Sequence, residues 1–311
     1  MPDMRALPIG VFDSGLGGLT VAREIMRTLP EESLVYLGDS ARCPYGPRDR
    51  SDVREFVLEI GSWLAKRPVK LIVIACNTAT AAGLPLAQRV FDVPVIGVVE
   101  PGARAAVQAT VNRRVGVIAT VGTVESGAYS RAVRALDAGV TVFSAAAPRF
   151  VDVVEAGLRM DDSPIEEWMS HTADVFIRPS FYEISRDYLD PLKRAGIDTL
   201  VLGCTHFPLL SPAIQQVVGP QVRLISSAEE TAREVAETLA ARGQLAERSG
   251  APVREFHTTG DATEFENLGS RILGVPTGPV GTVGVETLSS RVDDSIRAAA
   301  AAFAAEEEAC D

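Results

Sequence analysis

VLGCTHFPLL, residues 201–210, is a β-strand pattern that ends in a thiol, a hydroxyl and an imidazole. A second stretch, VIACNTATAA at residues 73–82, repeats the arrangement with Cys76, Asn77 and Thr78 after an apolar run. Open α/β sheets bind ligands at the carboxyl ends of their strands. The two stretches therefore predict two related lobes whose reactive strand ends face one cleft.

The rest of the chain alternates short apolar runs with amphipathic segments. Strands are expected at 9–12, 34–38, 71–76, 93–99, 114–120, 140–146, 198–204 and 222–227, and helices at 19–29, 49–66, 126–136 and 228–242. Continuous apolar strands separated by helices form parallel sheets covered on both faces. The expected fold class is α/β, with two pseudo-symmetric lobes that each hold a mostly parallel sheet flanked by helices.

The expected domain division follows the proline-containing breaks in this pattern. A divider is expected near Pro101-Gly102, and a second crossing soon after Pro208. The first lobe then holds residues 1–101 and 213–300 with Cys76, the second lobe holds residues 102–212 with Cys204, and an acidic tail covers 301–311. Residues 159–190 combine acidic clusters and aromatics without a clear period and are expected to be irregular.

Composition excludes several classes of protein. Of the 311 residues, 46% are hydrophobic and 23% charged, which is globular composition without a membrane-length apolar run. The net charge of −11 disfavours nucleic acid and anionic membranes as partners, because an acidic surface repels both. The N-terminus lacks the apolar core of a signal peptide, so a cytoplasmic protein is expected. Four cysteines without a CxxC pair predict reduced thiols, and no motif suggests a metal or a cofactor.

The segment DSGLGGLT, residues 13–20, superficially resembles a dinucleotide-binding loop. The third glycine of that motif is replaced by Thr20, and Asp13 stands where a pyrophosphate would be repelled. A nest of backbone N–H groups preceded by Asp13 and Ser14, which holds a small carboxylate or ammonium group, is the better interpretation.

The four cysteines divide into two pairs. Cys43 and Cys310 are expected to be inert, because free cysteine is commonly a buried packing residue. Cys76 and Cys204 each end an apolar strand before an expected helix start, with Thr78 or Thr205 as the cap, and helix N-termini stabilise thiolates.

Two opposed thiols suit the inversion of a stereocentre without a cofactor. One group removes the Cα proton and a second group returns a proton on the opposite face. The carbanion between these steps needs hydrogen-bond donors in a closed, low-dielectric cleft. Neutral candidates for that task are Ser14, Asn77, Thr78, Thr120, Thr123 and Thr205.

A series of motifs extends through nearly the whole chain. In order they are FDSGLGGLTV, LGDSARCPYG, IACNTATA, VIGVVEPGA, GVIATVGTVESGAY, VEAG, LVLGCTHFPLL and TGDATEFENLGSRILG. In these the chain resembles the glutamate racemases of the cofactor-independent aspartate/glutamate racemase superfamily. The resemblance implies an active site between two lobes, no cofactor, and interconversion of L- and D-glutamate that supplies D-glutamate for peptidoglycan. We expect a homodimer with glutamate as its small-molecule ligand.

The resemblance also implies roles for particular residues. Cys76 and Cys204 match the two catalytic bases, and Asp13, Glu155 and His206 match polar residues that assist the thiols. Substrate contacts are implied for Asp13, Ser14, Tyr45, Gly46, Asn77, Thr78, Thr120, Thr123, Thr205 and His206. Two departures from the family pattern are Asp152, where proline is more common, and the segment 160–183, which looks longer than usual.

Several alternatives remain open at the level of sequence. Aspartate or another amino acid could be the substrate of the same chemistry, and a non-catalytic amino-acid sensor could use the same cleft. His206 could be a strand-end histidine with satisfied hydrogen bonds, Glu155 an exposed acid at a helix end, and Tyr45 a packing residue of the CPYGP turn.

Overall fold

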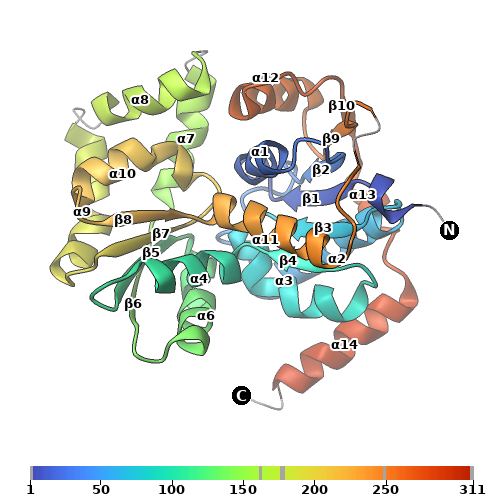
Figure 1. Ribbon diagram of the computed structural model, residues 1–311, viewed down its shortest axis with the longest axis horizontal. Coiled ribbons are helices and arrows are strands. Elements are labelled where there is room, and N and C mark those ends of the chain that lie inside the picture. The colour runs from blue at the N-terminus through green and yellow to red at the C-terminus, as the bar shows by residue number, and fades with distance from the viewer. Residues whose placement is uncertain (1–2, 161–162, 176–178, 248–249, 309–311) are drawn as a thin grey trace.

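The computed structural model describes residues 3–160, 163–175, 179–247 and 250–308. Figure 1 shows two α/β lobes side by side, each built on one sheet with helices packed around it. The sheet of the first lobe has the order β10-β9-β2-β1-β3-β4, and that of the second lobe has the order β6-β5-β7-β8. All pairings between these strands are parallel, which confirms the expected fold class.

The central strands are buried along their whole length, because helices cover both faces of each sheet. The strands of the first lobe are β1 (Ile9–Asp13), β2 (Leu34–Gly38), β3 (Leu71–Ile74), β4 (Val95–Gly97), β9 (Arg254–Thr258) and β10 (Val280–Thr282). Those of the second lobe are β5 (Arg114–Ala119), β6 (Thr141–Ala146), β7 (Thr199–Gly203) and β8 (Arg223–Ser226).

The helices follow the strands in the manner of βα units. In the first lobe they are η1 (Met4–Ala6), α1 (Leu19–Thr28), α2 (Arg50–Ala65), α3 (Asn77–Val90), α12 (Ala262–Leu273), α13 (Val285–Ser289) and α14 (Asp294–Glu308). In the second lobe they are α5 (Val121–Glu125), α6 (Ala128–Leu136), α7 (Arg149–Met160), α8 (Ile165–Val175), α9 (Pro179–Arg194), η2 (Phe207–Leu210) and α10 (Ser211–Val218). Within the described ranges, no helix combines the length and apolar character needed to span a bilayer.

The chain crosses between the lobes through two helices that pack against each other, α4 (Val99–Ala109) and α11 (Ser227–Ala241). The second crossing differs from the expectation: β8 pairs with β7, so residues 213–226 belong to the second sheet and not to the first lobe. Pro208, which suggested an earlier crossing, lies in the first turn of η2, and Pro212 lies in the first turn of α10. Proline is tolerated there because the first N–H groups of a helix have no intrahelical partner.

Residues 159–190, expected to be irregular, are mostly helical in the structure. They contain α8 and most of α9, with short stretches outside the described residues. Ile165 and Trp168 of α8 are buried, and α8 packs on α10. Contacts with residues distant in sequence therefore stabilise these helices, which the local sequence pattern does not predict. The strands β9 and β10 were also missed, because REFHT and VGT are short and partly charged or glycine-containing.

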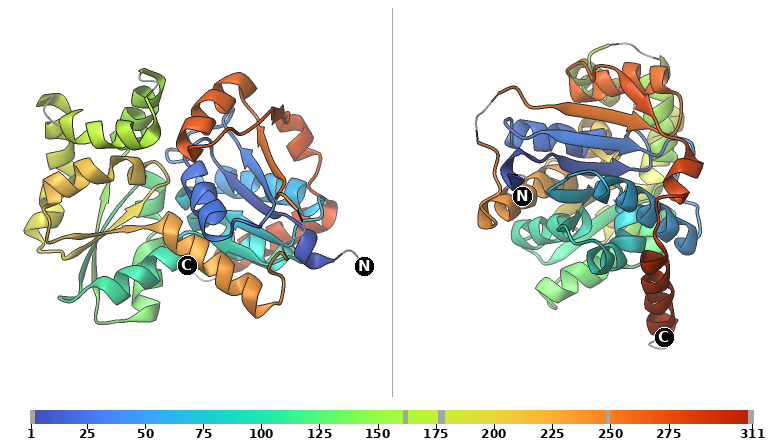
Figure 2. Two further views of the ribbon diagram at one scale, coloured as in Figure 1. Left: turned by 45° about the horizontal axis from the view of Figure 1, so that its top comes forward. Right: turned by 90° about the vertical axis from the view of Figure 1, so that its right-hand side faces the viewer.

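The C-terminal segment forms the expected helix, α14, at the edge of the first lobe (Figures 1 and 2). It is held there by ion pairs: Glu306 pairs with Arg89 at 2.6 Å, and Glu307 pairs with Arg54 at the same distance. Phe303 packs against the core of the first lobe. The described part of the expected acidic tail is thus a docked helix, whereas Cys310 lies outside the described residues.

Candidate active site

The site lies where strand ends of the two lobes meet. A cavity of about 20 Å³ there has space for about one water molecule. Its walls come from both lobes and comprise Ser14, Cys43, Pro44, Tyr45, Gly46, Cys76, Asn77, Thr78, Thr120, Val151, Cys204, Thr205 and His206. Of the residues expected from sequence, only Asp13, Thr123 and Glu155 are outside this lining. Each of them interacts with a lining residue: Asp13 with Cys76, Thr123 with Thr120, and Glu155 with His206.

A larger cavity of about 420 Å³ lies between α3, α4 and α6. Its walls are mainly apolar or small residues together with Glu100, Arg104 and Arg131, and they include neither of the strand-end thiols. We therefore assign the site to the smaller cavity, where titratable groups and hydrogen-bond donors converge.

Cys76 follows β3 and caps α3 itself. Its Sγ accepts the backbone N–H of Ala79 at 3.4 Å, so the expected cap, Thr78, is instead the second residue of the helix. Burial, together with the negative charge of the nearby Asp13, raises the pKa of Cys76 to about 12, although the hydrogen bond from the Ala79 N–H acts against the rise. At neutral pH this group is therefore a thiol and a potential proton donor, although a stabilised thiolate was expected.

Cys204 follows β7 and lies beside a histidine–carboxylate pair. Its Sγ is 3.7 Å from Nδ1 of His206, and Nε2 of the same ring is 3.3 Å from Oε1 of Glu155. Burial alone lowers the pKa of His206, but hydrogen bonds to Cys204 and Glu155 outweigh it and raise the pKa to about 10. The hydrogen bond to His206 in turn lowers the pKa of Glu155. The expected helix start is replaced by the short η2, so an imidazolium is the main cationic neighbour of Cys204.

Asp13 ends β1 and is fully buried. Its Oδ2 accepts the N–H of Gly15 at 3.0 Å, while Oδ1 has no hydrogen-bond partner among the described residues. Burial raises the pKa of Asp13, and backbone donors including Gly18 oppose the rise. A Cβ on Gly17 would lie 2.4 Å from Oγ1 of Thr205, so the glycine-rich loop packs tightly against the second lobe. The close approach of the two lobes therefore explains why residue 17 is a glycine, and binding of a phosphate is not needed to explain it.

Three threonine hydroxyls bridge the lobes beside the thiols. Oγ1 of Thr78 lies 2.9 Å from Oγ1 of Thr120 and 3.3 Å from that of Thr123, and the last two are 3.0 Å apart. Thr78 is in the first turn of α3, whose N-terminus favours negative charge. Together they form a compact group of donors suited to a carboxylate.

Asn77 lies next to this threonine group and lines the cavity. Its Oδ1 accepts a hydrogen bond from the phenol of Tyr129 at 2.8 Å, and Tyr129 belongs to α6 of the second lobe. Its Nδ2 is buried without a hydrogen-bond partner among the described residues. The side chain therefore offers an amide donor at the wall of the site.

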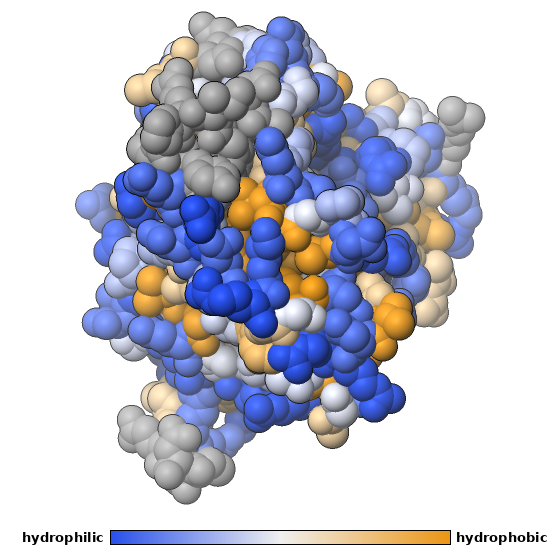
Figure 3. Space-filling model, turned by 90° about the vertical axis from the view of Figure 1, so that its left-hand side faces the viewer, coloured by the Kyte–Doolittle hydropathy of each residue, from blue (hydrophilic) through white to orange (hydrophobic). Residues whose placement is uncertain are grey.

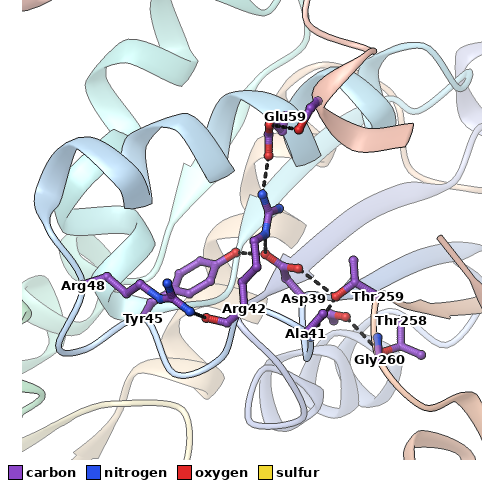
Figure 4. Close-up of polar contacts among 11 residues, drawn as sticks. Asp39, Ala41, Arg42, Tyr45, Arg48, Glu59, Thr258, Thr259 and Gly260 are labelled. Atoms are coloured by element: carbon purple, nitrogen blue, oxygen red, sulfur yellow. Dashed lines mark hydrogen bonds and ion pairs between the residues drawn. The ribbon is translucent and has the colours of Figure 1, made fainter. Parts of the chain in front are cut away.

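Tyr45 reaches the cavity, but its phenol is used elsewhere. Figure 4 shows the hydroxyl pointing to Asp39, to which it donates a hydrogen bond. Arg42 pairs with Asp39 at 2.7 Å and also with Glu59, and Oγ1 of Thr259 donates to Asp39 at 2.7 Å. We call Asp39, Arg42 and Glu59 the buried brace. The buried brace holds the 43–46 loop in place. Because the Tyr45 hydroxyl is bonded to Asp39, the loop contributes the ring of Tyr45 and the backbone around Gly46 to the site.

Sequence reasoning missed one thiol at the site. Cys43 was expected to be inert packing, yet it lines the cavity together with Cys76 and Cys204. Burial raises the pKa of Cys43 above its usual range, so it stays protonated. The LGDSARCPYG motif was the available signal, because its loop carries Tyr45 and Gly46. Asp152 lies in the first turn of α7, and the helix continues through Glu155 despite the missing proline.

No group of three His, Cys, Asp or Glu side chains with metal-binding geometry occurs among the described residues. The site instead combines two strand-end thiols in different electrostatic surroundings with donors for an anionic group. Such an arrangement can exchange protons on two faces of one bound molecule.

Comparisons with known proteins agree with this chemistry. The sequence model of the Asp/Glu/Hydantoin racemase family matches residues 9–235, and the chain belongs to that family. Within it, the chain is 47% identical over 271 residues to a glutamate racemase of Corynebacterium diphtheriae, covering 87% of this chain and 96% of that one. It is 46% identical over 276 residues to a glutamate racemase of Shouchella clausii, covering 89% and 94%.

Solved structures give the same result. A glutamate racemase of Bacillus anthracis superposes with a TM-score of 0.79 at 43% identity, covering 90% of this chain and 98% of that one. A glutamate racemase of Francisella tularensis in complex with D-glutamate superposes with a TM-score of 0.78 at 29% identity, covering 91% and 99%. The resemblance to glutamate racemases that the motifs indicated is thereby confirmed.

Proposed function

We propose that this protein interconverts L- and D-glutamate by proton transfer between two thiols and the Cα atom, without a cofactor. The observation that carries the proposal is the convergence of Cys76 and Cys204, from different lobes, on one cavity. The D-glutamate formed in this way serves peptidoglycan synthesis.

The two thiols have different roles in each direction. In the proposed scheme Cys204, whose Sγ faces the cationic ring of His206 at 3.7 Å, reacts as the thiolate. This thiolate removes the Cα proton of one enantiomer, and the thiol of Cys76 donates its proton to the opposite face. Cys204 is then a thiol, Cys76 a thiolate, and the product the other enantiomer; the reverse sequence returns the first. Asp13 lies next to Cys76 and can pair with the substrate ammonium.

The remaining donors stabilise the charge that develops between the two steps. The hydroxyls of Thr78, Thr120 and Thr123 can hydrogen-bond the carboxylate beside Cα. They act in a small, buried cavity, where electrostatic interactions are stronger than in water. These groups make a carbanion next to a carboxylate accessible.

Glutamate is the preferred substrate over aspartate for two reasons. Curated relatives at 46% and 47% identity are glutamate racemases, and a structural relative from Escherichia coli is a complex with L-glutamate and the activator UDP-MurNAc-ala. That relative superposes with a TM-score of 0.68 at 29% identity. An aspartate racemase homologue from Pyrococcus horikoshii is only 18% identical and shares the fold alone.

The proposal is tested by incubating the purified protein with L-glutamate in D₂O and a reductant, with no cofactor added. D-glutamate that carries deuterium at Cα is expected. L-aspartate in a parallel sample separates the two substrates. Deuterium exchange with aspartate alone would support the two-thiol chemistry but identify aspartate as the substrate. No exchange with either amino acid would favour a non-catalytic amino-acid sensor.

Single cysteine variants test the two-thiol scheme. Cys76→Ser and Cys204→Ser should each abolish racemisation, yet one should still exchange the Cα hydrogen of one enantiomer and the other that of its mirror image. The matched control is Cys43→Ser, which removes a third thiol from the same cavity and should racemise. Normal racemisation by both of the first two variants contradicts the scheme.

A cytoplasmic homodimer is the state we propose for the protein. Thiols at a working site have to stay reduced, which the cytoplasm ensures. On the face of the second lobe shown in Figure 3, apolar residues gather near the centre of a mostly hydrophilic surface. Such a patch is suited to contact with a second copy. Sedimentation velocity at two protein concentrations should give the mass of two chains, and the mass of one chain would contradict it.

A further inference from the structure

Tyr129 is a buried side chain that contacts both strand-end segments of the site. It is only 2% exposed, although it carries a polar hydroxyl. A Cβ on Gly203, which directly precedes Cys204, would lie 3.0 Å from Cε2 of Tyr129. A Cβ on Gly102 would lie 3.4 Å from the phenol oxygen. The ring is thus seated between two glycines, and its hydroxyl is confined to one position.

From that position the hydroxyl meets Asn77, the residue that follows Cys76. Tyr129 belongs to the second lobe and Asn77 to the first, so their 2.8 Å hydrogen bond crosses between the lobes. Burial raises the pKa of Tyr129 above its usual range, while a hydrogen bond with Ser227 acts against the rise. The phenol therefore stays protonated at neutral pH and can act as the donor.

An asparagine amide can be turned in two ways, and the phenol selects one of them. With the phenol as donor, Oδ1 must face Tyr129 and the NH₂ group must face the other way. Nδ2 is indeed the atom left buried and without a hydrogen-bond partner among the described residues, and Asn77 lines the cavity. A buried donor without a partner is costly, so its retention points to a ligand that completes it.

We propose that Tyr129 is a positioning residue that holds the amide of Asn77 with Nδ2 directed at the carboxylate of the bound amino acid. The inference rests on the proposed racemase function. Because Asn77 contacts the carboxylate before and after Cα loses its proton, this interaction contributes mainly to binding and less to the chemical step.

The first test is Tyr129→Phe, which keeps the ring in its seat and removes only the hydroxyl. KM for both enantiomers should rise about tenfold, as expected for losing about 1.4 kcal/mol of binding, with kcat within about threefold of the wild type. A structural role alone would lower the melting temperature and leave KM unchanged. Tyr188→Phe, which removes a partly buried phenol elsewhere in the second lobe, is the matched control and should leave KM unchanged.

A double-mutant cycle shows whether Tyr129 acts through Asn77. Asn77→Ala should raise KM by itself, and adding Tyr129→Phe to it should change KM by less than about twofold, since residues that act as one unit are not additive. Full additivity of the two effects, or a wild-type KM in Tyr129→Phe, would overturn the proposal. In either case racemisation of glutamate by the wild-type protein would leave the proposed function intact.

A second measurement needs no variant at Tyr129. The ¹⁵N–¹H signals of the Asn77 side-chain amide, assigned by their loss in Asn77→Asp, should shift when the wild-type protein is saturated with D-glutamate. Unshifted signals at saturation would show that this NH₂ group does not face the ligand, and the proposal would fail even if Tyr129→Phe did not fold.

Discussion

At the scale of single residues, the two strand-end cysteines differ because of their neighbours. Cys76 lies with Asp13, which disfavours negative charge on the thiol, whereas Cys204 lies 3.7 Å from the ring of His206. Glu155 keeps that ring charged from its other side, at 3.3 Å. The two thiols are equivalent in sequence pattern and inequivalent in electrostatics, which suits one donor and one acceptor of protons.

The pKa of His206 also makes stability depend on pH. Because it is raised to about 10 from an ordinary value near 6.5, its contribution is fully present below about pH 6.5 and is lost as the pH rises through about 10. Glu155→Gln removes the carboxylate that pairs with His206. It should lower the pKa of His206 and reduce the loss of stability as the pH rises. Urea unfolding at about pH 6, 7.5 and 9 gives the unfolding free energy at each pH, and hence its slope against pH.

The control for that experiment is Glu264→Gln. Glu264 pairs with Arg159 at 2.8 Å, as Glu155 does at 3.4 Å, but it is not paired with His206. Its variant should keep the wild-type slope. Equal slopes in Glu155→Gln and the wild type would show that Glu155 does not hold the charge on His206.

At the scale of elements, the loop after β2 depends on the buried brace. The side chains of Asp39 and Glu59 are 0% and 4% exposed, and that of Arg42 is 11% exposed. Arg42 also lies over the ring of Phe56, 4.0 Å from its centroid. The brace connects the loop to α2, and Ser289 of α13 donates a hydrogen bond to Glu59. The position of Tyr45 and Gly46 thus depends on charges outside the cavity.

Arg42→Leu should therefore destabilise the protein strongly. Removing one partner of a buried ion pair leaves uncompensated charge, which typically costs about 3–5 kcal/mol. Arg48→Leu is the matched control in the same loop: Arg48 is exposed and donates to the backbone oxygen of Arg42, and its loss should cost less than about 1 kcal/mol. Urea unfolding compares the two variants, and similar stabilities would contradict a role for the brace.

At the scale of the whole molecule, the structure is a closed form. The cavity between the lobes has space for about one water molecule, which is far less than an amino acid needs. Direct contacts hold the lobes together there, including the hydrogen bond from the N–H of Gly122 to the oxygen of Gly46 at 3.1 Å. We therefore expect the lobes to separate when the substrate enters, as in hinge closure around ligands.

Hydrogen exchange should detect this opening. In the free protein the amide of Gly122 should exchange through lobe separation, and saturating D-glutamate should protect it, because a ligand that binds the closed form shifts the population toward it. The amides of β5 at 115–118, bonded within the sheet, serve as the control and should not change. Equal protection of Gly122 with and without ligand would mean that these contacts do not open.

The local pattern of the sequence determined much of this protein. Short apolar runs such as LIVI and TLVLG, which contain β-branched residues, are typical of buried parallel strands, so the fold class and the two thiol-bearing strand ends were predictable. The motifs also indicated the racemase family. These features depend on residues close to one another along the chain.

Only the tertiary structure decided the rest. The placement of β8 in the second sheet, the buried helix α8, the entry of Cys43 into the cavity and the contact between Tyr129 and Asn77 all join segments far apart in sequence. The pKa directions of Cys76 and His206 likewise follow from burial and from charged neighbours that the fold supplies. Burial and long-range contact are properties of the packed chain, and no local pattern of residues encodes them.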